Sequence, residues 1–165
     1  MKKQWVLVCV LAAALMGGID GAAQHKAPNQ QPSTAAEPQA PPGEVTLGTV
    51  RLPRPVTADG KPLAAGNYTV KVTSQPSKPD AVGQTEQLER WAEFLKGKDV
   101  AGREVVTIVP QAEIKQVVKD APPASGGSKV QVLRGNEYLR VWFNRGGTHY
   151  LMHFPIAAGA PPAAR

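Results

Sequence analysis

The amino-acid sequence predicts a mainly β protein: an antiparallel β-sandwich of about seven strands with a C-terminal three-stranded meander and one short helix. Two observations lead to this fold class. Short runs of β-branched and aromatic residues alternate with polar residues, which is typical of half-buried strands. Glycine, proline, asparagine and aspartate separate these runs and indicate turns.

The N-terminal residues 1–23 have the anatomy of a secretory signal peptide. Lys2 and Lys3 precede an apolar run from Trp5 to Met16, and small residues follow it. The run is shorter than the roughly 20 residues that a membrane-spanning helix needs. We therefore expect an exported protein, periplasmic or secreted, whose mature chain has no stable membrane span.

Composition divides the rest of the chain into three regions. Residues 24–43 are rich in proline, alanine and glutamine, and such a segment buries too little apolar surface to offset the entropy of ordering. We expect a disordered linker there, a β domain at 44–156 and a flexible tail at 157–165. The single cysteine, Cys9, lies in the signal region, so the mature chain is expected to have no disulfide, thiolate metal site or cysteine nucleophile.

The charge pattern argues against one class of partner. The chain has a formal net charge of +6, but its cations are spread along the sequence rather than clustered. Such a distribution favours solubility, whereas nucleic-acid binding needs a basic patch. The sequence has no glycine-rich phosphate loop, and we expect no cofactor.

The first predicted strand occupies residues 44–52. Strict alternation places Leu47 on one face and Val50 and Leu52 on the other. Two prolines follow and end the strand, because proline cannot donate to a sheet ladder.

A turn and a second strand come next. Asp59–Gly60 is a turn signal, and Tyr68, Val70 and Val72 share one face of the strand that follows. The stretch Asp59–Val70, which reads DGKPLAAGNYTV, resembles the turn-then-strand element of small exported bacterial β domains and of transthyretin-like sandwich modules. In those families the glycine makes the corner and the tyrosine enters the core. The resemblance implies a β-sandwich and carries over no catalytic residue, because unrelated functions share the element.

Residues 85–97 allow two interpretations. Helical spacing is seen for Leu88, Trp91, Ala92 and Leu95. A helix, however, would bring the carboxylates of Glu89 and Glu93 together. We favour a hairpin with the strand at 103–109, because that strand needs a neighbour. A helix here would change the fold class to α+β.

A short helix is predicted after this hairpin. Pro110 is expected to end the preceding strand. Residues 112–119 then place Ile114, Val117 and Val118 on one helical stripe. We expect a short helix or turn lying on the edge of the sandwich.

The C-terminal part of the domain predicts three strands joined by two tight turns. Gly135–Asn136 can supply the positive φ of a two-residue turn, which sets Val132 opposite Leu139. The second turn lies within Asn144–Gly147 and is predicted to set Leu139 opposite Met152. Both turns keep the apolar residues of neighbouring strands together.

Alternation sorts this meander into two faces. The face that we interpret as core carries Val130, Val132, Leu139, Val141, Phe143, Tyr150, Met152 and Phe154. The other face is mixed and carries Lys129, Gln131, Leu133, Tyr138, Arg140, Trp142, His149, Leu151 and His153.

The aromatic and basic residues of the mixed face form the candidate binding surface: Tyr138, Arg140, Trp142, His149 and His153. The predicted register puts Tyr138 opposite His153 and Trp142 opposite His149. Aromatic and arginine side chains are enriched at binding surfaces because they bury much area at a small entropy cost. In the alternative interpretation, a loop or the helix with Ile114 covers this face, and Trp142 belongs to a second small core.

Metal and catalytic chemistry find little support in the sequence. His149 and His153 have the spacing of metal ligands on a helix, but on a strand they would lie roughly 13 Å apart. We expect no metal site. The serines fall in predicted linkers and loops without a nucleophile elbow, and no catalytic residue is assigned. Paired carboxylates for glycoside hydrolysis remain an option among the glutamates at positions 86, 89, 93, 104 and 137.

Together these features predict an exported, non-enzymatic binding or interaction module. Its ligand is not specified by the sequence, and a protein or a polysaccharide fits the surface. The alternatives are a structural accessory domain without a ligand and an enzyme that acts on extracellular carbohydrate.

Overall fold

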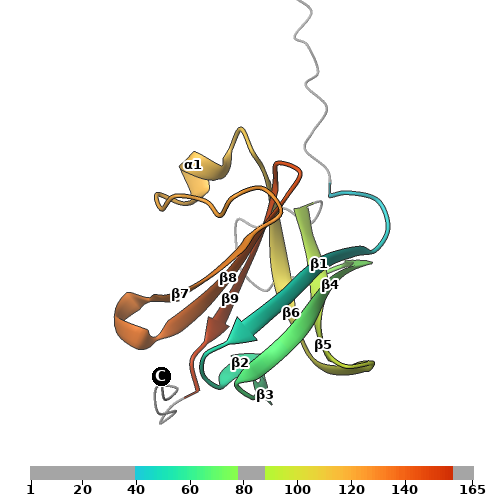
Figure 1. Cartoon of the computed structure of the whole chain (residues 1–165), viewed down its shortest axis with the longest axis vertical. Helices are drawn as coiled ribbons and strands as arrows, with labels where there is room; N and C mark the ends of the chain where they lie inside the picture. The colour runs from blue at the N-terminus through green and yellow to red at the C-terminus, as the bar shows by residue number, and fades with distance from the viewer. Residues whose placement is uncertain (1–39, 78–87, 158–165) are drawn as a thin grey trace, which may run out of the picture. The chain divides into compact units, whose positions relative to one another are not determined.

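The computed structural model describes residues 40–77 and 88–157 (Figure 1). The signal peptide, Cys9, most of the linker and all but the first residue of the tail lie outside these ranges. In chain order the strands are β1 (Val45–Leu52), β2 (Val56–Ala58), β3 (Lys61–Leu63), β4 (Gly66–Pro76), β5 (Glu89–Lys96), β6 (Asp99–Pro110), β7 (Ser128–Leu133), β8 (Tyr138–Arg145) and β9 (Thr148–Pro155). One short helix, α1 (Ile114–Val117), lies between β6 and β7, and a 3-10 turn, η2 (Arg134–Asn136), joins β7 to β8.

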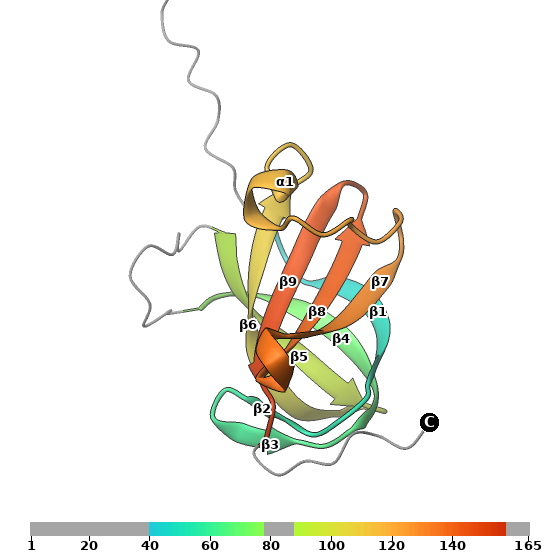
Figure 2. The same ribbon diagram turned by 90° about the vertical axis from the view of Figure 1, so that its left-hand side faces the viewer.

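Seven strands form one antiparallel sheet in the order β1-β4-β5-β6-β9-β8-β7. The sheet curls into a half-barrel, so that the half containing β1, β4 and β5 faces the half containing β7, β8 and β9 (Figures 1 and 2). The remaining strands, β2 and β3, pair with each other. The predicted fold class is confirmed, and a single curled sheet supplies both layers.

The core lies on the inner face of the curled sheet. Phe94 of β5 is fully buried and packs edge to face against Phe154 of β9, with ring centroids 5.2 Å apart. Tyr68 of β4 also contacts the Phe94 ring, with ring centroids 6.2 Å apart. The contact between Phe94 and Phe154 joins the two halves of the sheet, and edge-to-face geometry is an arrangement that aromatic rings prefer.

The prediction for β1 is wrong on which residues share a face. The pairing of β1 with β4 shifts register between Thr46 and Gly48, and Leu47 and Val50 are both buried. An extra residue in one strand makes a bulge and reverses the alternation beyond it. Gly48 has a φ of +111°, a conformation that favours glycine.

The β2–β3 hairpin turns at Asp59–Gly60, as predicted, and both turn residues have positive φ. Its apolar side packs on β6, where Leu63 and Ala58 lie against Gly102. The chain then enters β4 with Tyr68, whose side chain is buried and whose hydroxyl donates to the Ala64 carbonyl at 2.8 Å. The tyrosine therefore enters the core at the start of the strand.

The preferred hairpin over β5 and β6 is confirmed for the described residues from position 88 onward. Glu93 pairs with Arg103 across the two strands, and the turn between them contains Gly97 at a φ of +68°. Ala92 and Phe94 point into the core. Phe94 was not among the residues with helical spacing. Its burial two residues after Ala92 is what the alternation of a strand requires.

The short helix is confirmed, with one correction. Ile114 and Val118 are buried, but Val117 is 55% exposed. The helix lasts only four residues and the backbone of Val118 is extended, so the predicted stripe does not continue past it.

The two turns of the meander differ in outcome. Gly135 and Asn136 both have positive φ, and Val132 faces Leu139 as predicted. The second turn is formed by Gly146 and Gly147, so the predicted register is wrong by two residues and Leu139 faces Phe154 instead of Met152. A shift of two positions keeps every side chain on its face.

One residue of the predicted core face is not in the core. Val141 and Met152 are fully buried, whereas Val132 is 40% exposed. Val132 lies near the end of β7, one of the two edge strands of the seven-stranded sheet. A residue on the inner face of an edge strand has a neighbouring strand on only one side, which leaves it partly in water.

Candidate binding surface

The structure divides the five residues of the candidate surface. Trp142 and His149 are fully buried, Tyr138 and Arg140 are half-buried, and His153 is exposed. The predicted cross-strand pairs are also replaced: Arg140 faces His153, and Trp142 faces Leu151. Trp142 and His149 are therefore not available on the surface.

A second small core explains the burial of Trp142. It contains Trp142, Leu151, Val109, Ile114 and Val118, all buried on the outer face of the sheet. The chain from Gln111 to Pro123, which includes α1, lies over this face, and we call it the strap (Figure 2). The alternative interpretation of the sequence, in which the segment with Ile114 covers Trp142, is confirmed.

His149 fastens the strap to the sheet through its two ring nitrogens. The indole Nε1 of Trp142 donates to His149 Nδ1 at 3.1 Å. Because an indole can only donate, Nδ1 carries no proton and Nε2 carries one. The Nε2 atom then donates to Gln111 Oε1 of the strap at 2.9 Å. Burial lowers the pKa of His149, so the neutral imidazole is the stable form in the folded protein.

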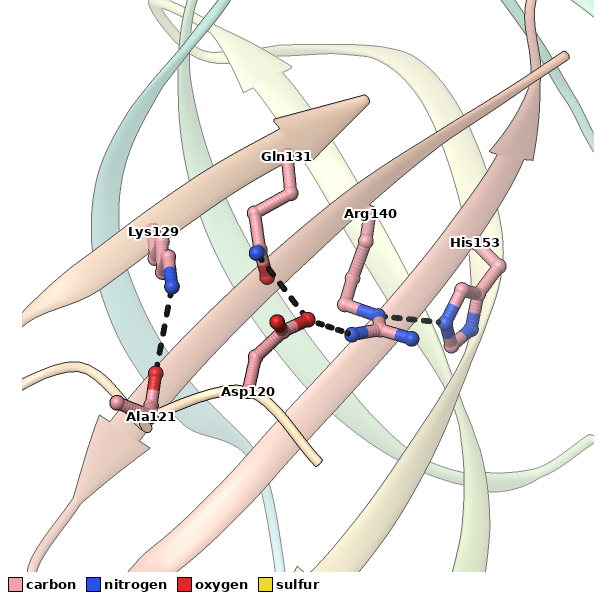
Figure 3. A network of polar contacts seen from close by, with 6 residues as sticks. All are labelled: Asp120, Ala121, Lys129, Gln131, Arg140 and His153. Atoms are coloured by element: carbon pink, nitrogen blue, oxygen red, sulfur yellow. Dashed lines mark hydrogen bonds and ion pairs between the residues drawn. The ribbon is translucent and has the colours of Figure 1, made fainter. Parts of the chain in front are cut away.

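Arg140 lies at the centre of a polar network at the other end of the strap (Figure 3). Its Nε atom donates to His153 Nε2 at 2.9 Å, and its Nη1 atom contacts Asp120 Oδ2 at 3.4 Å. Asp120 Oδ2 also accepts from Gln131 Nε2 at 3.3 Å. Burial lowers the pKa of Arg140, and the charge of Asp120 opposes this effect. The guanidinium is thus held in one orientation.

Two further contacts tie the strap to neighbouring strands. Lys129 Nζ of β7 donates to the Ala121 carbonyl at 3.3 Å. Asn144 Nδ2 of β8 donates to the Pro123 carbonyl at 3.0 Å. The end of the strap therefore lies across β8 and β7 (Figure 3).

A second aromatic and basic pair, which was not predicted from the sequence, lies on β5 and β6. Trp91 is half-buried on the outer face, and the Arg103 guanidinium lies 4.3 Å from the centroid of its ring. Arg103 Nε also contacts Asp59 Oδ2 of the β2–β3 turn at 2.7 Å. In a strand over residues 89–96, alternation places Trp91 on the outer face, away from the buried Ala92 and Phe94. The alternation of this strand could therefore have predicted its position.

Trp91 and Arg140 belong to one row of side chains that crosses the outer face. Trp91 pairs with Val105, and Arg140 pairs with both His153 and Gln131. The two halves of the row meet because β6 and β9 pair immediately beside Val105 and His153. We call these five residues, together with Arg103, the outer row: Trp91, Arg103, Val105, His153, Arg140 and Gln131.

The carboxylates proposed for glycoside hydrolysis fall at different places in the described chain. Glu89 begins β5 and is buried, which raises its pKa. Glu93 faces Arg103 on the outer side of the β5–β6 hairpin, while Glu104 is the next residue along β6 and points to the other face. Glu104 accepts the backbone N–H groups of Asp59 and Val105, each at 3.0 Å, and burial raises its pKa. Glu137 adjoins the turn between β7 and β8, and the residue at position 86 lies outside the described ranges.

Over 40–77 and 88–157, no group of three or more histidine, cysteine, aspartate or glutamate residues is arranged to hold a metal ion. In the same ranges, none of the helices has the length and apolar character to cross a membrane.

Comparison with known proteins does not place the chain in a family. No family model, no curated protein and no solved structure matches it.

Proposed function

We propose that this protein is an exported, non-enzymatic binding module whose contact surface is the outer row. The observation that carries the proposal is the stacked Trp91–Arg103 pair, an aromatic ring and a cation held together on an outward face of the sheet. The row continues to His153 and Arg140 across two further strands. Tryptophan and arginine are the residue types that most often dominate binding energy.

Preorganisation supports the same proposal. Asp59 holds the guanidinium of Arg103 near the Trp91 ring, and Asp120 and His153 hold that of Arg140. A stacked cation at an exposed site contributes about 0.5–1 kcal/mol. A partner that meets side chains already fixed in position loses less free energy to ordering them.

The charges of the row indicate the chemistry of the partner. Arg103 and Arg140 are paired with the carboxylates of Asp59 and Asp120, and both aspartates belong to turns or loops beside the sheet. An anionic group of a partner can replace either aspartate at its guanidinium. A protein or polysaccharide that carries carboxylate or sulfate groups fits this surface, and its rings or apolar groups would contact Trp91.

A binding experiment with substituted proteins tests the proposal. The chain is titrated with an acidic polysaccharide, a neutral polysaccharide and polyglutamate, and binding is measured by calorimetry and by the shift in thermal midpoint. We expect an acidic polymer to bind. Trp91→Ala should weaken its affinity about tenfold or more, because this corresponds to the loss of about 1.4 kcal/mol at a central contact.

The matched control is Val100→Ala, at an exposed apolar position of the same hairpin outside the outer row. It should leave the affinity unchanged. If an acidic polymer binds equally well to the wild type and to both Trp91→Ala and Arg103→Ala, the outer row is not the contact surface.

A structural accessory domain is the second candidate function. This candidate is favoured because polar groups on the outer face already have hydrogen-bond partners within the chain. Trp142 donates to His149, and Arg140 donates to His153 and Asp120. A protein whose thermal midpoint responds to none of the three polymers would support this second candidate against the first.

A further inference from the structure

The strap covers the apolar residues of the second core, and one of its ends is hydrogen-bonded to His149 of the sheet. Ile114 and Val118 of the strap pack on Trp142 and Leu151 of the sheet. At this end a chain of side-chain hydrogen bonds runs from Gln111 of the strap through His149 to Trp142 of the sheet. A change in His149 therefore acts on both the strap and the residues beneath it.

Protonation of His149 is incompatible with this arrangement. The imidazolium ion has two N–H donors and no acceptor. Its Nδ1–H would point at the indole N–H of Trp142, so a hydrogen bond would become a contact between two donors. The positive charge would also be fully buried, next to Val109 on β6. Both effects favour a conformation in which the ring reaches water.

Among the described residues, the cross-strand neighbours of His149 carry no charge. On β6 its partner is Val109, and on β8 its partner is Asn144. The nearest cation along β8 is Arg145, whose guanidinium bonds the Leu47 carbonyl on the inner side of the sheet. On the strap the charged residues nearest to Gln111 in sequence are Glu113, which is half-buried, and Lys115, which is exposed. Burial is the cause of the lowered pKa of His149.

We propose that the strap is an acid-released cover, which leaves the sheet when His149 is protonated and exposes Trp142 and Leu151. The proposal does not depend on what the outer row binds. An exported protein meets the pH of its surroundings directly, so such a device would give it a second conformation in acid.

The direction of the effect follows from proton linkage. The closed strap holds His149 neutral, so the open strap binds the proton more readily. The closed state is fully favoured above the ordinary histidine pKa of about 6.5 and loses stability as the pH falls below it. With one proton coupled to opening, the opening constant rises by up to about tenfold per pH unit, until the pH reaches the lowered pKa of the closed state.

Hydrogen exchange of the full-length protein tests the proposal. Protection factors are measured by mass spectrometry at pH 7.5 and pH 5, each corrected for the intrinsic exchange rate. Peptides covering residues 111–123 should lose about tenfold or more of their protection at the lower pH. Peptides covering β4, in the main core, should keep theirs.

Substitutions identify the titrating residue. His149→Gln offers one acceptor and one donor end but does not titrate, and it should abolish the pH dependence of the strap. His153→Gln tests the other histidine of the same strand, whose Nε2 accepts from Arg140 in the network with Asp120 of the strap. If His149 is the titrating residue, the pH dependence at residues 111–118 persists in this variant. Gln111→Ala removes the strap's side of the bond and should loosen the strap already at pH 7.5.

A measurement on the wild-type protein tests the proposal even if a variant does not fold. Nitrogen NMR of the histidine rings should show a neutral His149 with the proton on Nε2, and its titration should coincide with the loss of strap protection. Equal strap protection at pH 7.5 and pH 5 would overturn the proposal, as would a pH dependence that persists in His149→Gln.

Discussion

Gly102 shows how a single residue sets a close contact in this fold. A Cβ atom at this position would lie 3.2 Å from Leu63 Cδ1 and 3.6 Å from Ala58 Cβ, both in the β2–β3 hairpin. The hairpin can pack on β6 at this distance because glycine has no side chain.

Gly102→Val should therefore push the hairpin away from β6. We expect a loss of about 1–3 kcal/mol in the free energy of unfolding, which is typical of overpacking. Urea denaturation measures this loss. Ala101→Val, at the exposed neighbouring position, is the control and should change the free energy by less than about 0.5 kcal/mol. Equal effects of the two substitutions would mean that the hairpin does not pack closely on Gly102.

At this scale the sequence predicts which way most side chains point, but not how far they are buried. Val141 and Met152 point into the core as alternation requires. Val132 shares their face and is nevertheless 40% exposed, because β7 lies at the edge of the sheet. The order of the strands depends on the whole sheet. The residues around Val132 therefore do not predict that its strand lies at an edge.

Among the elements, the strap offers a matched pair of positions. Ile114 and Val117 both lie in α1, yet Ile114 is 1% exposed and Val117 is 55% exposed. The difference arises because one side of this short helix faces Trp142 and the other faces solvent.

We expect Ile114→Ala to destabilise the strap by about 2–5 kcal/mol, the range for deleting a buried aliphatic side chain. Val117→Ala should change stability by less than about 0.5 kcal/mol. Hydrogen exchange should show the loss of protection mainly in residues 111–123. A similar effect of both substitutions would indicate that α1 does not pack on the sheet through Ile114.

Element types were more predictable than element partners. The hairpin of β5 and β6 could be preferred over a helix because its second strand needed a neighbour, and its pairing is confirmed. The second turn of the meander was centred one residue too early, which shifts the register by two, since Asn144–Gly147 contains several acceptable turns. Gly146 and Gly147 both adopt positive φ, which glycine does without strain, and this choice fixes the register.

On the scale of the whole molecule, Arg145 connects the two ends of the curled sheet. Its guanidinium extends from β8 to the carbonyl of Leu47 on β1 and also bonds the carbonyls of Gly127 and Asn144. A Cβ atom on Gly48 would lie 2.7 Å from Arg145 Nη2, so the bulge glycine also leaves room for this side chain.

Arg145→Ala should lower the free energy of unfolding by about 1–3 kcal/mol, because it removes the donor from carbonyls that are partly shielded from water. Chemical denaturation of the variant and the wild type gives this difference. Arg51→Ala, at an exposed position of β1, is the control and should have little effect. A loss no larger than that of the control would show that Arg145 does not hold the sheet closed.

The candidate site was predicted only in part, for a reason that belongs to this scale. Arg140 and His153 were expected on the outer face and lie there, facing one another. Trp142 was expected on the same face and is buried, because the strap arrives from a distant part of the sequence and covers it. Trp91 was not singled out, although the favoured strand would have placed it on the outer face by alternation.

The most direct test of the account compares the two tryptophans of the described chain. Trp142 lies beneath the strap and is fully buried, whereas Trp91 is half-buried in the outer row and contacts solvent. In a Trp5→Phe background, Trp142→Phe leaves the emission of Trp91, and Trp91→Phe leaves that of Trp142. At neutral pH, acrylamide should quench Trp91 several times more strongly than Trp142. Equal quenching, or stronger quenching of Trp142, would contradict both the cover and the contact surface.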